Sequence, residues 1–191
     1  GPFESNITKS IIPAASAYGM SPGPNDESHK TDCLNPYAAT KVAAEELCKL
    51  YTKLYNLDTI IFRYFNVYGE RQPIRGQYAP VIGIFLRQRS AGELLTIVGD
   101  GNQRRDFTYV GDVVKANIMA AISNPDPEAF GQVYNVGTGK ATSIKSIAEM
   151  ISDNIVHIPP RPAEARQSLA SVSKIKKVYG WEAKVNLKDW I

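Results

Sequence analysis

Tyr37 and Lys41 stand four residues apart at the start of a segment with a helical pattern. Residues i and i+4 share one face of a helix, so this spacing places the lysine ammonium group beside the tyrosine phenol. A free phenol has a pKa near about 10 and is a weak base at neutral pH, but a cation held against it stabilises the phenolate. The pair can therefore act as a general base that takes a proton and later returns it.

The same spacing also arises by accident. Ten tyrosines and thirteen lysines in 191 residues predict roughly one Tyr-x-x-x-Lys motif by chance, and the chain contains one. An exposed tyrosine beside a solvated lysine is the ordinary interpretation of the motif taken alone. Asn35 as the N-cap and Pro36 as the first helical residue place the pair at the amino-terminal end of the helix.

Strand and helix patterns alternate along the chain, which predicts an α/β fold. A short strand at 11–15, a helix from Pro36 to about Asn56 and a buried strand at 58–65 together predict a parallel crossover unit. Further helices are expected at 80–89, 112–122, 142–155 and 173–179, further strands at 94–98, 107–110 and 133–136, and a hairpin-like turn at 99–101. The sequence has no glycine-rich phosphate-binding turn after any of these strands.

The composition excludes several classes of protein. An apolar share of 43% is enough for a hydrophobic core, and no uninterrupted apolar run reaches the length of about 18 residues that a membrane span needs. No basic and then apolar leader opens the sequence, so a cytoplasmic location is expected. A net charge of +3 does not indicate nucleic acid as a partner. Cys33, Cys48, His29 and His157 lack metal-ligand spacing, so no metal site is expected.

Five motifs in a fixed order give the chain a resemblance to a known family. They are Ala-Ala-Ser-Ala-Tyr-Gly at 14–19, Tyr-Ala-Ala-Thr-Lys at 37–41, Arg-Tyr-Phe-Asn-Val-Tyr-Gly at 63–69, the segment 99–112, and Tyr-Asn-Val-Gly at 134–137. Together they resemble the extended short-chain dehydrogenase/reductase family. Within it the chain is similar to NAD-dependent nucleotide-sugar epimerases, above all UDP-N-acetylglucosamine 4-epimerases and their UDP-glucose and UDP-glucuronate relatives. Five ordered motifs are far less probable by chance than one.

The resemblance implies an architecture. Members of the family have leading strands and a glycine-rich turn that this chain lacks, so the expected fold is a partial Rossmann-type parallel sheet plus a small α+β substrate lobe. Residues 1–68, with 111–136 returning to them, are expected to be the remnant of the NAD-binding domain. Residues 69–110 and 137–191 are expected to form the nucleotide-sugar-binding lobe. A homodimer through the Tyr37 helix is also implied.

By resemblance, Tyr37 removes the proton from the sugar 4-hydroxyl while hydride passes from C4 to NAD, and Lys41 stabilises the phenolate and holds the nicotinamide ribose. The third catalytic residue of the family is a serine or threonine, and an ungapped alignment places Ala14 at that position. Ser16 is the hydroxyl in the immediate segment and is the candidate for this role. Whether Ala14 or Ser16 occupies the third position stays open.

The resemblance also assigns binding roles. Tyr37, Lys41, Tyr64 and Phe65 are expected to contact NAD. The residues expected to contact the nucleotide sugar are Asn66, Gln77, Tyr78, Ala79, Val81, Arg105 and Arg166. Guanidinium groups suit phosphate oxygens, so the two arginines are assigned to the diphosphate. The alternatives are core packing for Phe65 and ordinary surface ion pairs for the arginines, while Arg104 is expected to be exposed and Asp112 to cap or orient the helix that follows it.

The expected function is an NAD-dependent 4-epimerase of a UDP-sugar, of the UDP-GlcNAc/UDP-GalNAc or UDP-Glc/UDP-Gal type, acting through a transient 4-keto sugar. The segment 14–16 lacks the Thr-Asp-Glu triplet of the related dehydratases, which favours epimerisation. Two alternatives remain. The first is a non-catalytic sugar-nucleotide-binding protein, because the phosphate turn and a hydroxyl at position 14 are missing. The second is a UDP-sugar dehydratase or decarboxylase of the same family.

Overall fold

The computed structural model describes residues 8–13, 17–21, 23–76, 79–160 and 165–191, with side chains described from residue 17 onward. A parallel sheet lies at the centre of one half of the molecule. Its strands are β1 (Thr8–Pro13), β2 (Thr59–Tyr64) and β7 (Gln132–Val136), and their order in space is β1-β2-β7. Both pairings are parallel, so the predicted parallel crossover is confirmed.

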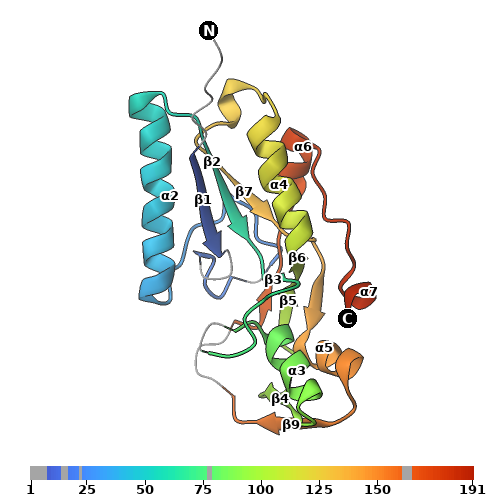
Figure 1. Cartoon of the computed structure of the whole chain (residues 1–191). Coiled ribbons are helices and arrows are strands. Elements are labelled where there is room, and N and C mark those ends of the chain that lie inside the picture. Colours follow the sequence, from blue (N-terminus) through green and yellow to red (C-terminus); the bar gives the residue numbers. More distant parts are fainter. Residues whose placement is uncertain (1–7, 14–16, 22, 77–78, 161–164) are drawn as a thin grey trace.

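Helices cover both faces of this sheet (Figure 1). On one face lies α2 (Pro36–Tyr55), which joins β1 to β2, and on the other lie α4 (Val110–Ile122) and α6 (Ser173–Tyr179). Successive side chains of a strand point to opposite faces. Accordingly Ile60 and Phe62 of β2 pack in the cluster that contains residues of α4 and α6, whereas Ile61 packs towards Cys48 of α2.

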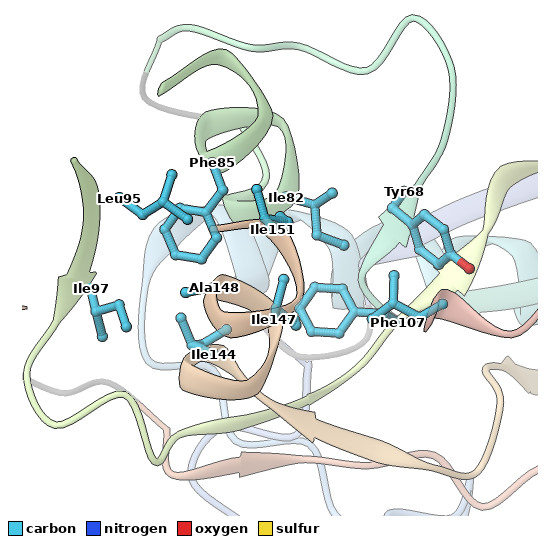
Figure 2. Packing of buried hydrophobic residues seen from close by; sticks show 11 residues of the cluster. Tyr68, Ile82, Phe85, Leu95, Ile97, Phe107, Ile144, Ile147, Ala148 and Ile151 are labelled. Atoms are coloured by element: carbon cyan, nitrogen blue, oxygen red, sulfur yellow. The ribbon is translucent and has the colours of Figure 1, made fainter. Parts of the chain in front are cut away.

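A second apolar cluster organises the other half of the molecule (Figure 2). It packs α3 (Val81–Ser90), β4 (Leu95–Val98) and α5 (Ile144–Ile151) against one another, and β4 pairs in parallel with β9 (Ile155–Ile158). Its buried members are Tyr68, Ile82, Phe85, Leu95, Ile97, Phe107, Ile144, Ile147, Ala148, Ile151 and Leu187. This half therefore has a core of its own, distinct from the cluster on the parallel sheet.

Short strands connect the two halves. The three-stranded sheet β10-β5-β8 consists of β10 (Gln167–Ser168), β5 (Arg104–Asp106) and β8 (Ala141–Ser143), with β5 antiparallel to β8 and parallel to β10. The two strands β3 (Val67–Tyr68) and β6 (Thr108–Tyr109) form a separate parallel pair. The remaining elements are the 3-10 helix η1 (Pro127–Ala129) and the short helix α7 (Leu187–Trp190). None of the described helices has the length and apolar character of a membrane span.

Most predicted elements are present, and the ends of α2 fall where the sequence places them. The Asn35 side chain accepts a hydrogen bond from the Ala38 amide at 2.9 Å, and Asn56 ends the helix in the left-handed conformation with φ of 52°. The apolar residues of its outer face are exposed. The expected division at 1–68, 69–110, 111–136 and 137–191 stays a prediction.

Two expectations about the chain after residue 98 are wrong. The turn at 99–101 does not close a hairpin, because β4 pairs with β9 and β5 pairs with β8 and β10. Gly99 and Gly101, with φ of 64° and 73°, instead turn the chain from one sheet into another. The helix expected at 142–155 ends at Ile151, and Ile155 begins β9 instead, because pairing with β4 overrides the helical spacing of the isoleucines.

The capping role expected of Asp112 is also wrong, because α4 has no side-chain cap. Asp112 lies in the first turn of α4, but its carboxylate accepts hydrogen bonds from the backbone amides of Lys184 and Val185, at 2.7 and 2.9 Å, and pairs with Lys115. The Trp181 indole donates to its carbonyl oxygen. Asp112 therefore fastens the carboxyl-terminal segment to α4.

The Asp112 contacts predict an acid-sensitive stability. Burial alone would raise the pKa of Asp112, but the amides of Val185 and Lys184 and the charge of Lys115 hold it below the ordinary value of 3.8. A carboxyl with a lowered pKa stabilises the fold above its unfolded pKa, and this stabilisation is lost as pH falls through the folded pKa. We expect Asp112→Asn to cost about 1–3 kcal/mol near neutral pH and to flatten the loss of stability below about pH 4.

Urea unfolding followed by circular dichroism between pH 3 and 7 measures this effect. Asp153→Asn is the control, because Asp153 is an exposed carboxyl, and it should keep the wild-type profile. An Asp112→Asn profile parallel to that of the wild type below pH 4 would contradict the assignment.

Candidate active site

The first turn of α2 lies at the carboxyl ends of the parallel strands, because α2 runs back along the sheet from that edge (Figure 1). Tyr37 is 45% exposed there, and the Lys41 ammonium nitrogen lies 5.3 Å from the centre of its ring. The predicted pairing on one helix face is therefore present in the structure. Ligands of open parallel sheets bind at this edge, so the pair lies at the end of the sheet where a ligand is expected.

The third catalytic position lies outside the described residues, together with two of the expected substrate contacts. Ala14 and Ser16 belong to the segment 14–16, and Gln77 and Tyr78 form the segment 77–78. Their roles stay predictions. The residues that follow Ser16 are firmly placed, since the Ala17 carbonyl accepts the Asp32 amide at 2.9 Å and Tyr18 is 2% exposed.

Tyr64, Phe65 and Asn66 lie at and after the carboxyl end of β2. The Tyr64 hydroxyl donates to the Asn117 side chain at 3.0 Å, and Phe65 is fully buried and stacks on Tyr18 with 6.2 Å between the ring centres. The Asn66 amide donates to the Asp106 carbonyl at 3.2 Å. The burial of Phe65 agrees with the alternative of core packing, and the cofactor contacts of Tyr64 and Phe65 stay predictions.

A pocket of about 390 Å³ opens beside Asn66. Four of the expected substrate contacts share its wall: Asn66, Ala79, Val81 and Arg105. The other lining residues come from β3, α3, β4, β9, the start of α5 and the segments flanking α3 and β5, and they are Val67, Pro80, Ile84, Phe85, Thr96, Val98, Gln103, Phe107, Ile144 and Ile158. The wall is mostly apolar with a few polar groups, which is the usual character of a small-molecule site.

Arg105 reaches this pocket from a strand that a buried carboxylate holds in place. Asp106, fully buried, accepts hydrogen bonds from the amide and hydroxyl of Thr138 at 2.8 and 2.7 Å and from the amides of Gly139 and Ala170 at 2.9 and 3.2 Å. Burial raises the pKa of Asp106, against the lowering effect of these donors. Arg104, which precedes Arg105 in the chain, is exposed, as expected from the sequence.

Arg166 lies in an adjoining pocket of about 500 Å³, which shares Val98, Gln103 and Ile158 with the first. Its guanidinium pairs with the Asp100 carboxylate at 3.0 Å, and its side chain is 74% exposed. This pair matches the alternative of a surface ion pair, which is worth little energy. The structure therefore does not place Arg166 in the same pocket as Arg105.

Several functional candidates carry no sequence motif. Thr96 and Gln103 line the first pocket, but isolated polar residues in a strand and a turn give no usable signal. Glu45 and Arg63, which form a buried ion pair, could have been found. Glu45 continues the four-residue spacing of Tyr37 and Lys41, and Arg63 is a charge inside an apolar strand pattern. Among the described residues, no cluster of histidine, cysteine and acidic side chains could hold a metal ion.

Comparison with known proteins is consistent across sequence and structure. The putative UDP-glucose 4-epimerase of Methanocaldococcus jannaschii is 39% identical over 174 residues, which are 88% of this chain and 54% of that protein. The crystal structure of the Thermotoga maritima UDP-glucose 4-epimerase with UDP-glucose matches with a TM-score of 0.89 and 30% identity, over 97% of this chain and 60% of that one. The UDP-N-acetylglucosamine 4-epimerase of Methanobrevibacter ruminantium, in complex with UDP-N-acetylmuramic acid, has a TM-score of 0.88 and 34% identity over the same shares.

The chain thus spans a little over half the length of these relatives. The likeness confirms the expected α/β fold with a partial Rossmann-type sheet, and related structures contain NAD. Residues 7–137, more than half of the chain, match the model of the NAD dependent epimerase/dehydratase family. Because the ordered motifs, the fold and this match agree, the chain belongs to the NAD-dependent epimerase/dehydratase family of short-chain dehydrogenase/reductase type.

Proposed function

We propose that this chain provides the proton-transfer and nucleotide-sugar-binding residues of an NAD-dependent UDP-sugar 4-epimerase. The observation that carries the proposal is the Tyr37–Lys41 pair, with 5.3 Å between the ammonium nitrogen and the ring centre, at the carboxyl edge of a parallel sheet. A pocket beside this edge is lined by four of the residues that the resemblance assigns to the nucleotide sugar. Relatives that act on UDP-sugars support the same assignment.

In this proposal the Tyr37 phenolate accepts the proton of the sugar 4-hydroxyl and becomes the phenol, which returns the proton to the sugar oxygen when the 4-keto sugar has turned over. Lys41 stabilises the phenolate and donates to the nicotinamide ribose. Bound NAD supplies a reversible hydride acceptor for C4 of the sugar. The residues present fit the nicotinamide-ribose half of NAD, because Tyr37 and Lys41 stand side by side with the phenol exposed. The sequence has no glycine-rich turn for the pyrophosphate.

We assign the uridine diphosphate to the pocket of Asn66, Ala79, Val81 and Arg105. Gln77 and Tyr78, immediately before this wall in the chain, belong to the same proposal. Arg166 is assigned to the diphosphate as well, and an anionic ligand would have to replace Asp100 as its partner. The sugar is of the UDP-GlcNAc/UDP-GalNAc or UDP-Glc/UDP-Gal type, and Ser16 is the proposed third catalytic residue.

A non-catalytic sugar-nucleotide-binding protein is the second candidate. The observation that favours it is Ala14 at the ungapped position of the family hydroxyl. Both functions use the same pocket, so only turnover separates them. A decarboxylase or dehydratase would instead release a decarboxylated or a 4-keto product.

Replacing Tyr37 tests the proposed chemistry. We expect Tyr37→Phe to lower kcat about 10²–10⁴-fold with little change in KM, because a general base is lost and the ring remains. NMR measures this loss of kcat by monitoring the interconversion of UDP-GlcNAc with UDP-GalNAc and of UDP-Glc with UDP-Gal. The assay uses the natural polypeptide that carries this sequence. Lys53→Met is the control, since Lys53 is an exposed residue of the same helix outside its apolar face. Binding of UDP-sugar by the wild type without any turnover would support the second candidate.

Replacing Arg105 tests the proposed diphosphate site. We expect Arg105→Ala to weaken binding of UDP about 10–100-fold, because a charge-assisted hydrogen bond contributes about 1.5–3 kcal/mol. Titration calorimetry of the chain with UDP measures the loss. Arg104→Ala is the matched control, because Arg104 is the exposed neighbour, and should stay within about twofold of wild type. Equal losses in both variants would show that only net charge matters.

We also propose that the protein is a cytoplasmic homodimer formed through α2. The outer face of this helix presents five large apolar side chains that are 47–69% exposed, namely Leu47, Leu50, Tyr51, Leu54 and Tyr55. The rings of Tyr51 and Tyr55 lie 5.3 Å apart and form part of the same stripe. A contiguous apolar face of this kind usually marks an interaction surface.

A charge on this face should disrupt the dimer. We expect Leu54→Glu to convert the protein to a monomer, because a carboxylate cannot be buried in an apolar interface without a partner. Light scattering after size-exclusion chromatography measures the mass. Ile122→Glu on α4 is the control, since Ile122 is 79% exposed on the opposite side of the sheet. A monomeric wild type would contradict the proposal.

A further inference from the structure

We infer that Arg63 is a positioning residue for the Tyr37–Lys41 pair. Arg63 lies on β2 and touches two elements at once, α2 and the turn at 17–19 that follows the proposed third catalytic residue. The inference rests on the proposed function, because it concerns the geometry of the same catalytic groups. It assigns a role in turnover to a side chain that has no contact with the pocket.

The first contact of Arg63 is a buried, two-pronged ion pair with α2. Its Nε and Nη2 atoms donate to the two carboxylate oxygens of Glu45 at 3.0 and 2.9 Å. The side chains of Arg63 and Glu45 are 2% and 1% exposed. A planar guanidinium that engages both oxygens fixes distance and angle together, which a single hydrogen bond does not.

This ion pair determines the rotation of the catalytic helix. Tyr37, Lys41 and Glu45 follow one another at intervals of four residues, so they lie along one side of α2. Because Glu45 is fastened to the sheet, a turn of the helix about its own axis would pull Glu45 from Arg63. The same constraint keeps Tyr37 and Lys41 directed along the edge of the sheet.

The second contact of Arg63 is with Tyr18. The guanidinium carbon lies 4.8 Å from the centre of the Tyr18 ring, which is a cation–π distance. Tyr18 is itself fixed, because its hydroxyl donates to the Asn135 side chain at 2.8 Å and its ring stacks on Phe65. Tyr18 is two residues beyond Ser16. Arg63 therefore connects α2, which carries Tyr37, to the turn at 17–19, which follows Ser16 in the chain.

Stability alone is a weak reason for such a pair. Two charges buried together lose hydration, and well-packed apolar residues of similar volume often replace a buried ion pair without loss of stability. Geometry is a stronger reason, because a displacement of about 1 Å between catalytic groups can cost about 100-fold in rate. The two hydrogen bonds from the planar Arg63 guanidinium to Glu45 hold α2 in a defined position on the sheet. An apolar contact would allow the helix to shift along the sheet.

Kinetics of mild variants test the positioning role. We expect Arg63→Lys, which keeps the charge but cannot form the fork, to lower kcat about 10–100-fold while KM for the UDP-sugar changes less than about twofold. Glu45→Gln should behave in the same way. Glu46→Gln is the matched control, because Glu46 is the exposed neighbour that pairs only with Lys49, and it should keep the wild-type kcat. Unchanged kcat in both Arg63→Lys and Glu45→Gln, or parallel changes in kcat and KM, would overturn the inference.

Amide hydrogen exchange of the chain tests the coupling without any turnover. We expect Arg63→Lys to speed exchange about tenfold both in 38–44 of α2 and in 17–19, while the amides of α5 exchange at the wild-type rate. Glu46→Gln should change neither segment. Loosening of one segment alone, or of α5 as well, would overturn the inference. If the wild type lacks epimerase activity, the proposed function fails while this measurement still decides whether Arg63 couples the two elements.

Discussion

Because β1 and β2 pair in parallel, the chain must return along the sheet to its starting edge before β2 begins. The crossover helix α2 makes this return. The crossing brings the first turn of α2 to the carboxyl ends of the strands, where Tyr37 and Lys41 meet. The strand end that carries Phe65 and Asn66 reaches the same edge, because it belongs to the neighbouring strand. The Tyr37–Lys41 pair and the wall of the pocket are thus neighbours because β1 and β2 run in the same direction.

Buried carboxylates connect the two halves of the molecule. The apolar clusters are separate, one on the parallel sheet and one between α3, β4 and α5. Between them, Asp106 holds the loop after β7 and the segment after β10, and Asp112 holds the segment at 184–185. Backbone amides are the main partners of both carboxylates, and Asp112 also pairs with the Lys115 ammonium group, so the burial of each carboxylate is compensated. Directed hydrogen bonds of this kind fix orientation more strictly than apolar contact does.

The sequence predicts those parts of the fold whose signals are local. The ends of α2 depend on Asn35, Pro36 and Asn56, which act within one helical turn, and they were predicted correctly. The hairpin at 99–101 was predicted wrongly because the partner of β4 is β9, about 60 residues away along the chain. The same pairing ends α5 before Ile155. Long-range pairing leaves no local pattern, and for this reason topology was harder to predict than the elements themselves.

The residues of the candidate site that carry a local sequence signal could also be predicted, and those brought together by long-range packing could not. Tyr37 and Lys41 could be predicted because their relation is a helical spacing, and Arg105 because it stands in a motif. Thr96 and Gln103 could not, since only the packing of β4 against its neighbours brings them to the pocket.

The two arginines assigned to the diphosphate differ in a way that the sequence does not reveal. Arg105 lies in β5, which the Asp106 carboxylate holds in place through four hydrogen bonds. The backbone of Arg105 is therefore in position before any ligand binds. Arg166 is 74% exposed and is paired with Asp100 at the surface, where an ion pair is weak. Exchange of Asp100 for a phosphate would therefore cost little energy. The two adjoining pockets therefore differ: Arg105 stands on a backbone that is fixed beforehand, whereas the Arg166 side chain can exchange its partner.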